Sequence, residues 1–272
     1  MNRWELCRGS RWLAAFLLTS SVTVAVGAQE KATQVSRPFF GRWKLNPAKS
    51  NLTTTRLIFA SSASGDITMT MQGQSQTFRI DGKERPGILG STMSWTQTGP
   101  RSWRTVYKMA NVDNNIDNYT LSADGQKLTM TTDILLPTKS RQTMTFSRIA
   151  DGLGLIGTWQ AKSLQSSESL EFTAADGGRV KIWLPFGGTA VVTPDGKEAP
   201  IEGRASVVAP GMTAALTVTG TRTFDLSMKL NGANVVIGNF TVAADGKSMT
   251  VKSTFGPDGP AQEHLTATYE KS

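Results

Sequence analysis

The chain has 272 residues, of which 39% are hydrophobic, and carries a formal net charge of +8. Its 29 Lys and Arg residues are scattered and do not gather beside a recognition helix, which disfavours nucleic-acid binding although the positive charge favours acidic surfaces. With one cysteine, Cys7, and one histidine, His264, the composition excludes metal sites built from these residue types and a disulfide within the chain. We therefore expect burial of apolar area to stabilise one or two domains.

The first 28 residues have the pattern of a secretory signal peptide. Three arginines precede an apolar run over residues 12–26, and this run contains Thr and Ser and is too short to span a membrane comfortably. We predict cleavage after Ala28, a flexible leader over residues 29–38, and a periplasmic or secreted protein. No transmembrane segment is expected once the signal peptide, with its cysteine, is removed.

The rest of the chain contains two copies of one unit. Residues 119–130, YTLSADGQKLTM, match residues 240–251, FTVAADGKSMTV. A G-x-W motif and a D-G-K-E motif also recur, and the spacing between the copies drifts from 114 to 123 residues, as expected after a duplication whose loops changed length. We predict two homologous repeats, residues 39–150 and 151–272.

Within each repeat the dominant sequence period is two. Over residues 102–109, apolar and threonine side chains alternate with mostly polar ones, which is typical of a strand with one buried and one wetter face. Asp-Gly pairs at Asp124 and Asp245 lie between alternating runs and indicate tight hairpin turns. We expect an all-β fold with about eight or nine strands in each repeat, arranged as barrels or sandwiches.

The opening of the first repeat resembles that of a known family. Residues 41–50, GRWKLNPAKS, are similar to the G-T-W-K-L-N-x-x-K-S opening of small secreted bacterial lipocalin-like proteins. Those proteins also tend to carry D-G-K-x-x-P midway and to end in a Y-x-K-like strand, which this chain has at residues 81–86 and 269–271. The second repeat keeps only G-T-W of the opening. The resemblance implies two tandem up-and-down antiparallel lipocalin-like barrels and leaves the function open.

The resemblance also implies a structural role for two tryptophans. In lipocalin-like barrels the G-x-W tryptophan closes one barrel end, and a basic residue from the last strand packs across it. Here the implied pairs are Trp43 with Arg148 and Trp159 with Lys271. A cation over an indole face gains about 0.5–2 kcal/mol, so we expect these residues to stabilise the fold and not to act in catalysis.

Residues with catalytic or metal-binding chemistry are few. His264 has no recognisable triad partners, and we interpret it as a solvated surface residue. Residues 112–118, VDNNIDN, offer oxygen ligands for Ca²⁺ but lack EF-hand spacing, so we interpret them as a polar hairpin. Met69 and Met71 have a spacing suited to Cu(I), yet the second repeat has Ile and Leu there, which favours core packing. We expect no metal, no cofactor and no catalytic residue.

The clearest difference between the repeats concerns the residues expected inside the barrels. Large aromatic and polar side chains in the first repeat replace aliphatic ones or Phe in the second, at Trp95, Gln97, Trp103, Thr105 and Tyr107. An apolar cavity with a few polar groups is typical of a small-molecule site. The alternative is a filled core whose polar groups bond one another. We hypothesise that these five residues line a ligand pocket in the first repeat.

Three functions remain open at this point. The leading hypothesis is an exported, non-enzymatic protein that binds a small apolar or amphipathic molecule in the first repeat. The second is a structural or interaction protein of the cell envelope with both barrels filled. The third is an enzyme that modifies lipids or isoprenoids, which no acid–base constellation in the sequence supports. No motif indicates an oligomeric state.

Overall fold

The computed structural model describes residues 37–150, 152–256 and 263–272. The expected signal peptide, its cleavage site after Ala28 and most of the leader lie outside these residues. The described part is all-β, with twenty strands and three short 3₁₀ helices, η1 (Pro47–Lys49), η2 (Ile88–Gly90) and η3 (Asp176–Gly178). None of the helices in this part is both long and apolar enough to span a membrane.

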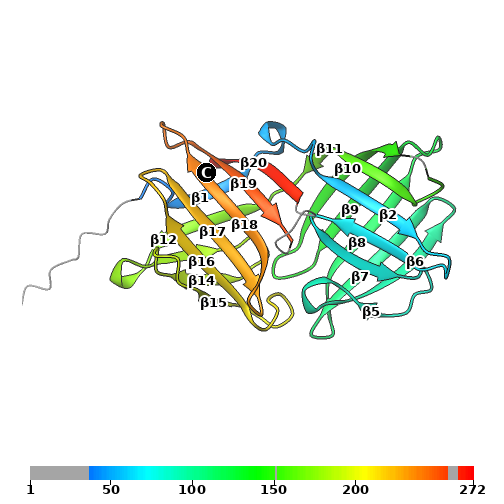
Figure 1. Ribbon diagram of the computed structural model, residues 1–272, viewed down its shortest axis with the longest axis horizontal. Helices are drawn as coiled ribbons and strands as arrows, with labels where there is room; N and C mark the ends of the chain where they lie inside the picture. Colours follow the sequence, from blue (N-terminus) through cyan, green and yellow to red (C-terminus); the bar gives the residue numbers. More distant parts are fainter. Residues whose placement is uncertain (1–36, 151, 257–262) are drawn as a thin grey trace, which may run out of the picture. The chain divides into compact units, whose positions relative to one another are not determined.

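Ten of the strands form a closed antiparallel barrel (Figure 1), here called the closed barrel. In sheet order they are β1 (Gly41–Leu45), β12 (Ser169–Ala174), β13 (Val180–Trp183), β14 (Thr189–Val192), β15 (Ala199–Glu202), β16 (Met212–Val218), β17 (Thr223–Leu230), β18 (Ala233–Val242), β19 (Ser248–Phe255) and β20 (Glu263–Lys271). Pairing of β1 with β20 closes the ring, so this sheet has no free edge.

The other ten strands form a nearly closed sheet, here called the open barrel. In sheet order they are β4 (Gln74–Phe78), β3 (Ile67–Met71), β2 (Arg56–Ser61), β11 (Gly157–Gln165), β10 (Ser140–Ala150), β9 (Lys127–Ile134), β8 (Val112–Leu121), β7 (Ser102–Met109), β6 (Thr92–Gly99) and β5 (Arg85–Pro86). The two edge strands, β4 and β5, do not pair in the described structure, and we call the gap between them the seam. The prediction of an all-β chain with two antiparallel barrels is confirmed, with ten strands in each sheet and not eight or nine.

The two sheets do not follow the two sequence repeats. Strand β1, from the first repeat, pairs with β12 and β20, whereas β11, the first strand of the second repeat, pairs with β2 and β10. In Figure 1 the blue β1 accordingly runs with the red β20. Because only a few residues connect β10 to β11, these strands form a local antiparallel pair. β11 thereby occupies the position next to β2, and β1 completes the other barrel.

Each G-x-W tryptophan is fully buried in the core of the barrel that its strand joins, Trp43 in the closed barrel and Trp159 in the open barrel. The Trp43 indole donates to the backbone carbonyl of Phe39 at 2.8 Å, and the Trp159 indole donates to that of Leu155 at 3.0 Å. The two tryptophans therefore have equivalent surroundings, with each N–H satisfied by the carbonyl four residues before it.

A basic residue covers each of these tryptophans, but the implied pairs, Trp43 with Arg148 and Trp159 with Lys271, are wrong. The Arg148 guanidinium carbon lies 4.1 Å from the Trp159 ring centroid, and the Lys271 ammonium nitrogen lies 5.2 Å from that of Trp43. The reason is the strand exchange. Each repeat keeps its last strand in its own barrel and gives its first strand to the other.

The glycine of the G-x-W motif is required by the same basic residue. A Cβ atom at Gly157 would lie 2.5 Å from Arg148 Nη1, and one at Gly41 would lie 2.8 Å from Lys271 Cε. Both glycines also have a positive φ, +139° and +126°, which L side chains rarely adopt. The motif thus leaves room for a cation to cross the strand and reach the indole face.

Candidate functional site

Four of the five predicted ligand-binding residues lie inside the open barrel. Trp95 and Thr105 are 0% exposed, Trp103 is 6% exposed and Tyr107 is 9% exposed. The fifth, Gln97, is exposed and donates its side-chain amide to the Gly99 carbonyl at 3.0 Å. Its placement inside the barrel is therefore wrong, because the pairing of β6 with β7 becomes irregular after Gln97 and the strand end leaves the core.

The strand register brings inward-facing polar groups side by side across four strands. Trp95 on β6 is opposite Thr105 on β7, Thr105 is opposite Asp117 on β8, and Asp117 is opposite Thr132 on β9. Directly opposite residues in antiparallel strands have Cβ atoms about 4.5–5.5 Å apart. We call these four residues the polar belt of the open barrel.

Asp117 is the acidic member of the belt and is 9% exposed. Its carboxylate accepts hydrogen bonds from the Thr132 hydroxyl at 2.6 Å and the Tyr119 hydroxyl at 3.3 Å. None of the ion pairs among the described residues involves it. Burial raises the pKa of Asp117 to about 6, because desolvation disfavours the charged form more than the two hydroxyl donors favour it.

Two further polar side chains extend the site toward β4. Gln76 donates its side-chain amide to the Tyr107 hydroxyl at 2.9 Å, and both residues are buried. The Met69 sulfur lies 3.9 Å from Gln76 Nε2 and 3.8 Å from the Tyr119 hydroxyl, so it links these groups. Burial raises the pKa of Tyr107 and that of Tyr119, and both phenols are neutral at physiological pH.

Several buried polar atoms have no hydrogen-bond partner among the described residues. They are Gln76 Oε1, Trp95 Nε1, Thr105 Oγ and Asn114 Oδ1. Each such atom costs roughly 1–3 kcal/mol relative to a satisfied one. Trp95 and Thr105 are neighbours in the belt, and Gln76 bonds Tyr107 with its other atom. The open barrel thus has unused donors and acceptors within its interior.

Aromatic rings lie against the belt. The Trp95 ring stacks on Phe78 at a centroid distance of 4.1 Å and on Tyr119 at 4.9 Å, with interplanar angles of 9° and 24°. Phe59 meets Trp95 and Tyr119 edge-on at 5.9 and 6.0 Å. Trp95 is therefore stacked on two aromatic rings, one of which, Tyr119, donates its hydroxyl to Asp117.

The closed barrel has apolar or smaller residues at every register-equivalent position of this site. Its equivalents of Gln76, Trp95, Thr105, Tyr107, Asp117, Tyr119 and Thr132 are Ala190, Leu216, Leu226, Met228, Gly238, Phe240 and Ser253. At Gly238 an added Cβ would lie 2.6 Å from the Phe240 ring, so this ring occupies the space that the Asp117 side chain has in the open barrel. The polar interior therefore belongs to one barrel only.

Sequence reasoning missed the most important member of this site. The interpretation of residues 112–118 as a polar hairpin is wrong, because the turn lies at Ala110 and Asn111, both with positive φ, and Asp117 lies within β8. The missed signal is strand parity, since Asp117 alternates in step with the apolar Tyr119 and Leu121. The described residues contain no group of three or more His, Cys, Asp or Glu placed to hold a metal ion.

Two surface hollows lie away from the belt. One, of about 440 Å³, is lined by residues that include Ile201, Val208 and Met212, and another, of about 420 Å³, by residues that include Lys44 and Glu270. Neither is lined by any residue of the belt. A ligand of the open barrel would therefore need its packed interior or its seam to open.

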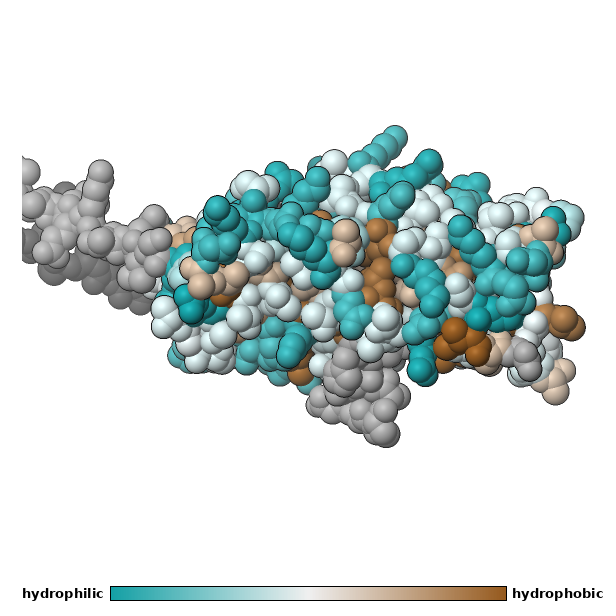
Figure 2. All heavy atoms as spheres, turned by 90° about the horizontal axis from the view of Figure 1, so that it is seen from above, coloured by the Kyte–Doolittle hydropathy of each residue, from teal (hydrophilic) through white to brown (hydrophobic). Residues whose placement is uncertain are grey.

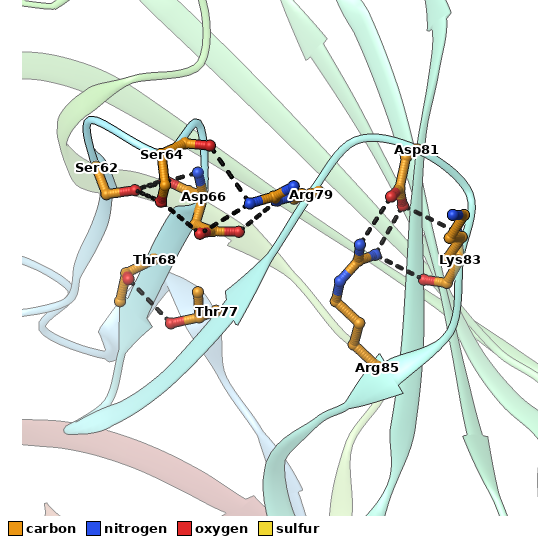
Figure 3. Close-up of polar contacts among 9 residues, drawn as sticks. All are labelled: Ser62, Ser64, Asp66, Thr68, Thr77, Arg79, Asp81, Lys83 and Arg85. Carbon is orange, nitrogen blue, oxygen red and sulfur yellow. Dashed lines mark hydrogen bonds and ion pairs between the residues drawn. The ribbon is translucent and has the colours of Figure 1, made fainter.

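The seam is bordered by exposed ion pairs (Figure 3). Arg79, just after β4, pairs with Asp66 at 2.6 Å, and Arg85 on β5 binds both carboxylate oxygens of Asp81 at 2.7 Å. These partners lower the pKa of Asp66 to about 2 and hold the pKa of Asp81 well below its usual range. Such solvated pairs contribute little to stability, so the contacts that join the two sides of the seam lie in the interior, where Phe78 stacks on Trp95 and Gln76 donates to Tyr107.

Gln76 lies at this seam. Gly87 is in the segment that follows β5, and a Cβ atom added to it would lie 3.7 Å from the unpaired Gln76 Oε1. The polar interior of the open barrel therefore extends to the place where the sheet is interrupted.

Comparison with known proteins adds no family assignment. No protein-family model and no curated protein matches the chain. A solved structure, of a Bacteroides fragilis NCTC 9343 protein provisionally named an outer membrane protein, aligns over 87% of this chain and 100% of that chain at 8% identity and a TM-score of 0.20. A TM-score this low carries no argument about fold or function. The chain is a β-barrel protein, and its lipocalin-like resemblance stays a prediction.

Proposed function

We propose that this chain is an exported protein that binds a small amphipathic molecule inside the open barrel. The observation that carries the proposal is the contrast between two barrels of repeated sequence. The closed barrel fills the equivalent positions with Ala190, Leu216 and Leu226, whereas the open barrel has Gln76, Trp95 and Thr105 with unpaired buried atoms. The closed barrel shows that this barrel architecture does not need polar groups at these positions. A ligand that bonds to the unpaired atoms of the open barrel would explain why they are there.

The mixed chemistry of the site favours an amphipathic ligand over a purely apolar one. The side chains of Trp95, Tyr119 and Phe59 form an apolar cluster, and Asp117 and Thr105 lie in the belt beside it. Small-molecule sites combine a largely apolar lining with a few polar groups that orient the ligand. This narrows the hypothesis drawn from the sequence, which allowed an apolar molecule as well.

The outer faces of the barrels favour contact with water. On β7 the outward positions are Arg104, Val106 and Lys108, and the face shown in Figure 2 is mostly hydrophilic or neutral, with hydrophobic atoms in small separate patches. A barrel that spans a membrane instead presents an apolar band outward. Export itself rests on the signal-peptide pattern of residues 1–28.

A structural role in the envelope is the second candidate. Dense aromatic packing around Trp95, whose ring stacks on both Phe78 and Tyr119, favours a filled barrel. This candidate predicts that no small molecule binds saturably.

Calorimetric titration and thermal unfolding of the exported chain with a panel of small amphipathic compounds separate the two candidates. We expect at least one compound to bind saturably and to raise Tm. Thr105→Val removes the unpaired hydroxyl at nearly constant shape and should weaken that compound about tenfold. Ser253→Ala removes a hydroxyl from the equivalent belt of the closed barrel and should change affinity less than threefold. Binding by no compound, or loss through Ser253→Ala alone, would reject the proposal.

A further inference from the structure

We propose that the ligand of the open barrel carries an ammonium group, which pairs with Asp117 while its apolar part lies against Trp95 and Tyr119. This inference rests on the proposed function and names the class of ligand: a small primary amine with an aromatic or short aliphatic body. It is carried by three features of the site, namely a buried carboxylate with unused acceptor sites, the lack of a cation beside it and the adjoining aromatic rings.

The first feature is the incomplete hydrogen bonding of Asp117. An ionised carboxylate offers about four acceptor sites, and only the hydroxyls of Thr132 and Tyr119 donate to it. Both donors are neutral, so the charge has no counter-charge among the described residues. A buried carboxylate without a cation is costly, and a cationic ligand would remove that cost on binding.

The second feature excludes the opposite ligand charge. The belt and its neighbours Gln76, Tyr107 and Tyr119 include no Lys or Arg. A ligand with a carboxylate or phosphate head would place its charge beside Asp117 with no basic residue to receive it, and like charges at this range repel. Fatty-acid-like molecules, which the apolar sequence pattern alone allowed, are therefore poor candidates.

The third feature is the ring geometry. Trp95 and Tyr119 stack with their centroids 4.9 Å apart, and Tyr119 also donates to Asp117. Because Trp95 also stacks on Phe78, a ligand bound at Asp117 meets the Tyr119 hydroxyl and the edges of this ring stack. The unpaired Gln76 Oε1 is a further acceptor for an N–H group, and the unpaired Trp95 Nε1 donates to any acceptor that the ligand carries.

The net positive charge of the chain does not oppose this assignment. The belt and its described neighbours contain no Lys or Arg, so Asp117 is the nearest charged group to a ligand head in the barrel interior. The other titratable groups near it are Tyr107 and Tyr119, both neutral, and Asp133 on the opposite face of β9, which pairs with Arg141 at 2.6 Å.

The geometry implies a specific pH dependence. An ammonium ligand binds the ionised form of Asp117, so protons compete with it below the pKa of that carboxyl, about 6 in the ligand-free protein. The apparent Kd of an amine should therefore be nearly constant from pH 7 to 8. Below pH 6 it should rise about tenfold per pH unit, and an alcohol should show no such change.

The test uses ligands that share a body and differ in the head group. Octylamine, octan-1-ol and octanoate form one series, and 2-phenylethylamine, 2-phenylethanol and 3-phenylpropanoate form another. Each is titrated calorimetrically into the exported chain at pH 7.5. We expect the amine of at least one series to bind ten times or more tighter than its alcohol, and the carboxylate to bind weakest.

Two variants locate the charge. Asp117→Asn keeps the shape of the side chain but removes its charge, and should weaken the amine at least thirtyfold and abolish its pH dependence. Asp133→Asn, next to the site on the same sheet, should change amine affinity less than threefold. If Asp117→Asn does not fold, as judged by circular dichroism, the pH profile of amine binding to the unaltered chain decides the question.

The outcomes separate this inference from the function on which it rests. Alcohols or carboxylates that bind as tightly as the amines, or amine binding that does not change between pH 7 and 5, would overturn the ammonium assignment and leave the binding function standing. Failure of all six compounds to bind would overturn both.

Discussion

Arg148 on β10 covers the indole of Trp159 on β11, at 4.1 Å from the ring centroid, although the two residues belong to different sequence repeats. The mirror relationship joins Trp43 on β1 to Lys271 on β20. Each barrel is thus completed by a strand from the other repeat. This exchange makes the two repeats mutually dependent.

The exchange predicts that neither repeat folds as a monomer on its own. A 29–150 fragment lacks β11 and its Trp159, and a 151–272 fragment lacks β1 and its Trp43. Each fragment therefore has unpaired strand edges and an exposed core at the place of the missing tryptophan. We expect separate fragments to show no cooperative thermal transition or to self-associate, and an equimolar mixture to regain the transition of the intact chain. Two monomeric fragments that each unfold cooperatively would contradict the exchange.

The G-x-W tryptophans should contribute equally to stability. Trp43→Ala and Trp159→Ala each delete a fully buried indole and should lower the free energy of unfolding by about 3–5 kcal/mol. Trp183→Ala is the control, because Trp183 is 45% exposed and its removal should cost less than about 1 kcal/mol. Urea unfolding measures all three. A loss below about 1 kcal/mol at Trp43 would show that this indole does not close the barrel.

Asp117 should make the chain less stable as pH rises. Its folded pKa of about 6 exceeds the ordinary value of 3.8, so the unfolded chain loses this proton first and stability falls between about pH 4 and pH 6. The shift corresponds to about 3 kcal/mol. Asn mimics the neutral acid, so the stability of Asp117→Asn does not depend on this titration. The difference in free energy of unfolding between the variant and the unaltered chain should therefore grow by about 3 kcal/mol from pH 4 to pH 8. An equal difference at both pH values, from urea unfolding, would refute the burial of this carboxylate.

The seam should be the least protected part of the open barrel. Edge strands β4 and β5 do not pair with each other, and the ion pairs beside them, Asp66 with Arg79 and Asp81 with Arg85, are solvated. Amide hydrogen exchange should therefore be faster in β4 and β5 than in the equivalent β14 and β15, which pair in the closed barrel. Equal protection factors in the two pairs of strands would show that the seam is closed in solution.

The alternation of residues 102–109 and the Asp-Gly turns sufficed to predict strands, hairpins and a doubled β fold. The partner of β1 could not be predicted, because both barrels offer the same pairing surface next to the last strand, and the short β10–β11 connection decides between them. Gln97 has inward parity but leaves the core at a register irregularity, which a simple alternation does not reveal.

The inward orientation of Asp117 was difficult to predict from the sequence for a different reason. In sequence it stands among Asn and Asp residues typical of a turn, and only its phase with Tyr119 and Leu121 shows that it faces the core. Its partners Thr132 and Tyr119 follow from register, which the sequence does not specify to a single residue. The repeat comparison nevertheless indicated which barrel has the polar interior, because Leu216 and Leu226 occupy the positions in the closed barrel that Trp95 and Thr105 occupy in the open barrel.

Thr105→Val should separate stability from binding. The Thr105 hydroxyl is fully buried and has no partner among the described residues, so replacing it by a methyl group should stabilise the chain by about 1 kcal/mol. Thr132→Val is the contrasting change, since it removes a hydroxyl that donates to Asp117 at 2.6 Å and should destabilise the chain. If both variants lost stability in urea unfolding, the Thr105 hydroxyl would have a partner in solution.

The indole N–H resonances of the chain give the most direct test of ligand binding inside the open barrel. Trp95 Nε1 has no partner among the described residues, whereas the indoles of Trp43 and Trp159 donate to backbone carbonyls. On titration with 2-phenylethylamine or octylamine in ¹⁵N-labelled protein, we expect the Trp95 indole signal to shift saturably while the other two stay in place. An unshifted Trp95 signal at saturating concentrations of both amines, or equal shifts at Trp43, would contradict a binding site in the open barrel.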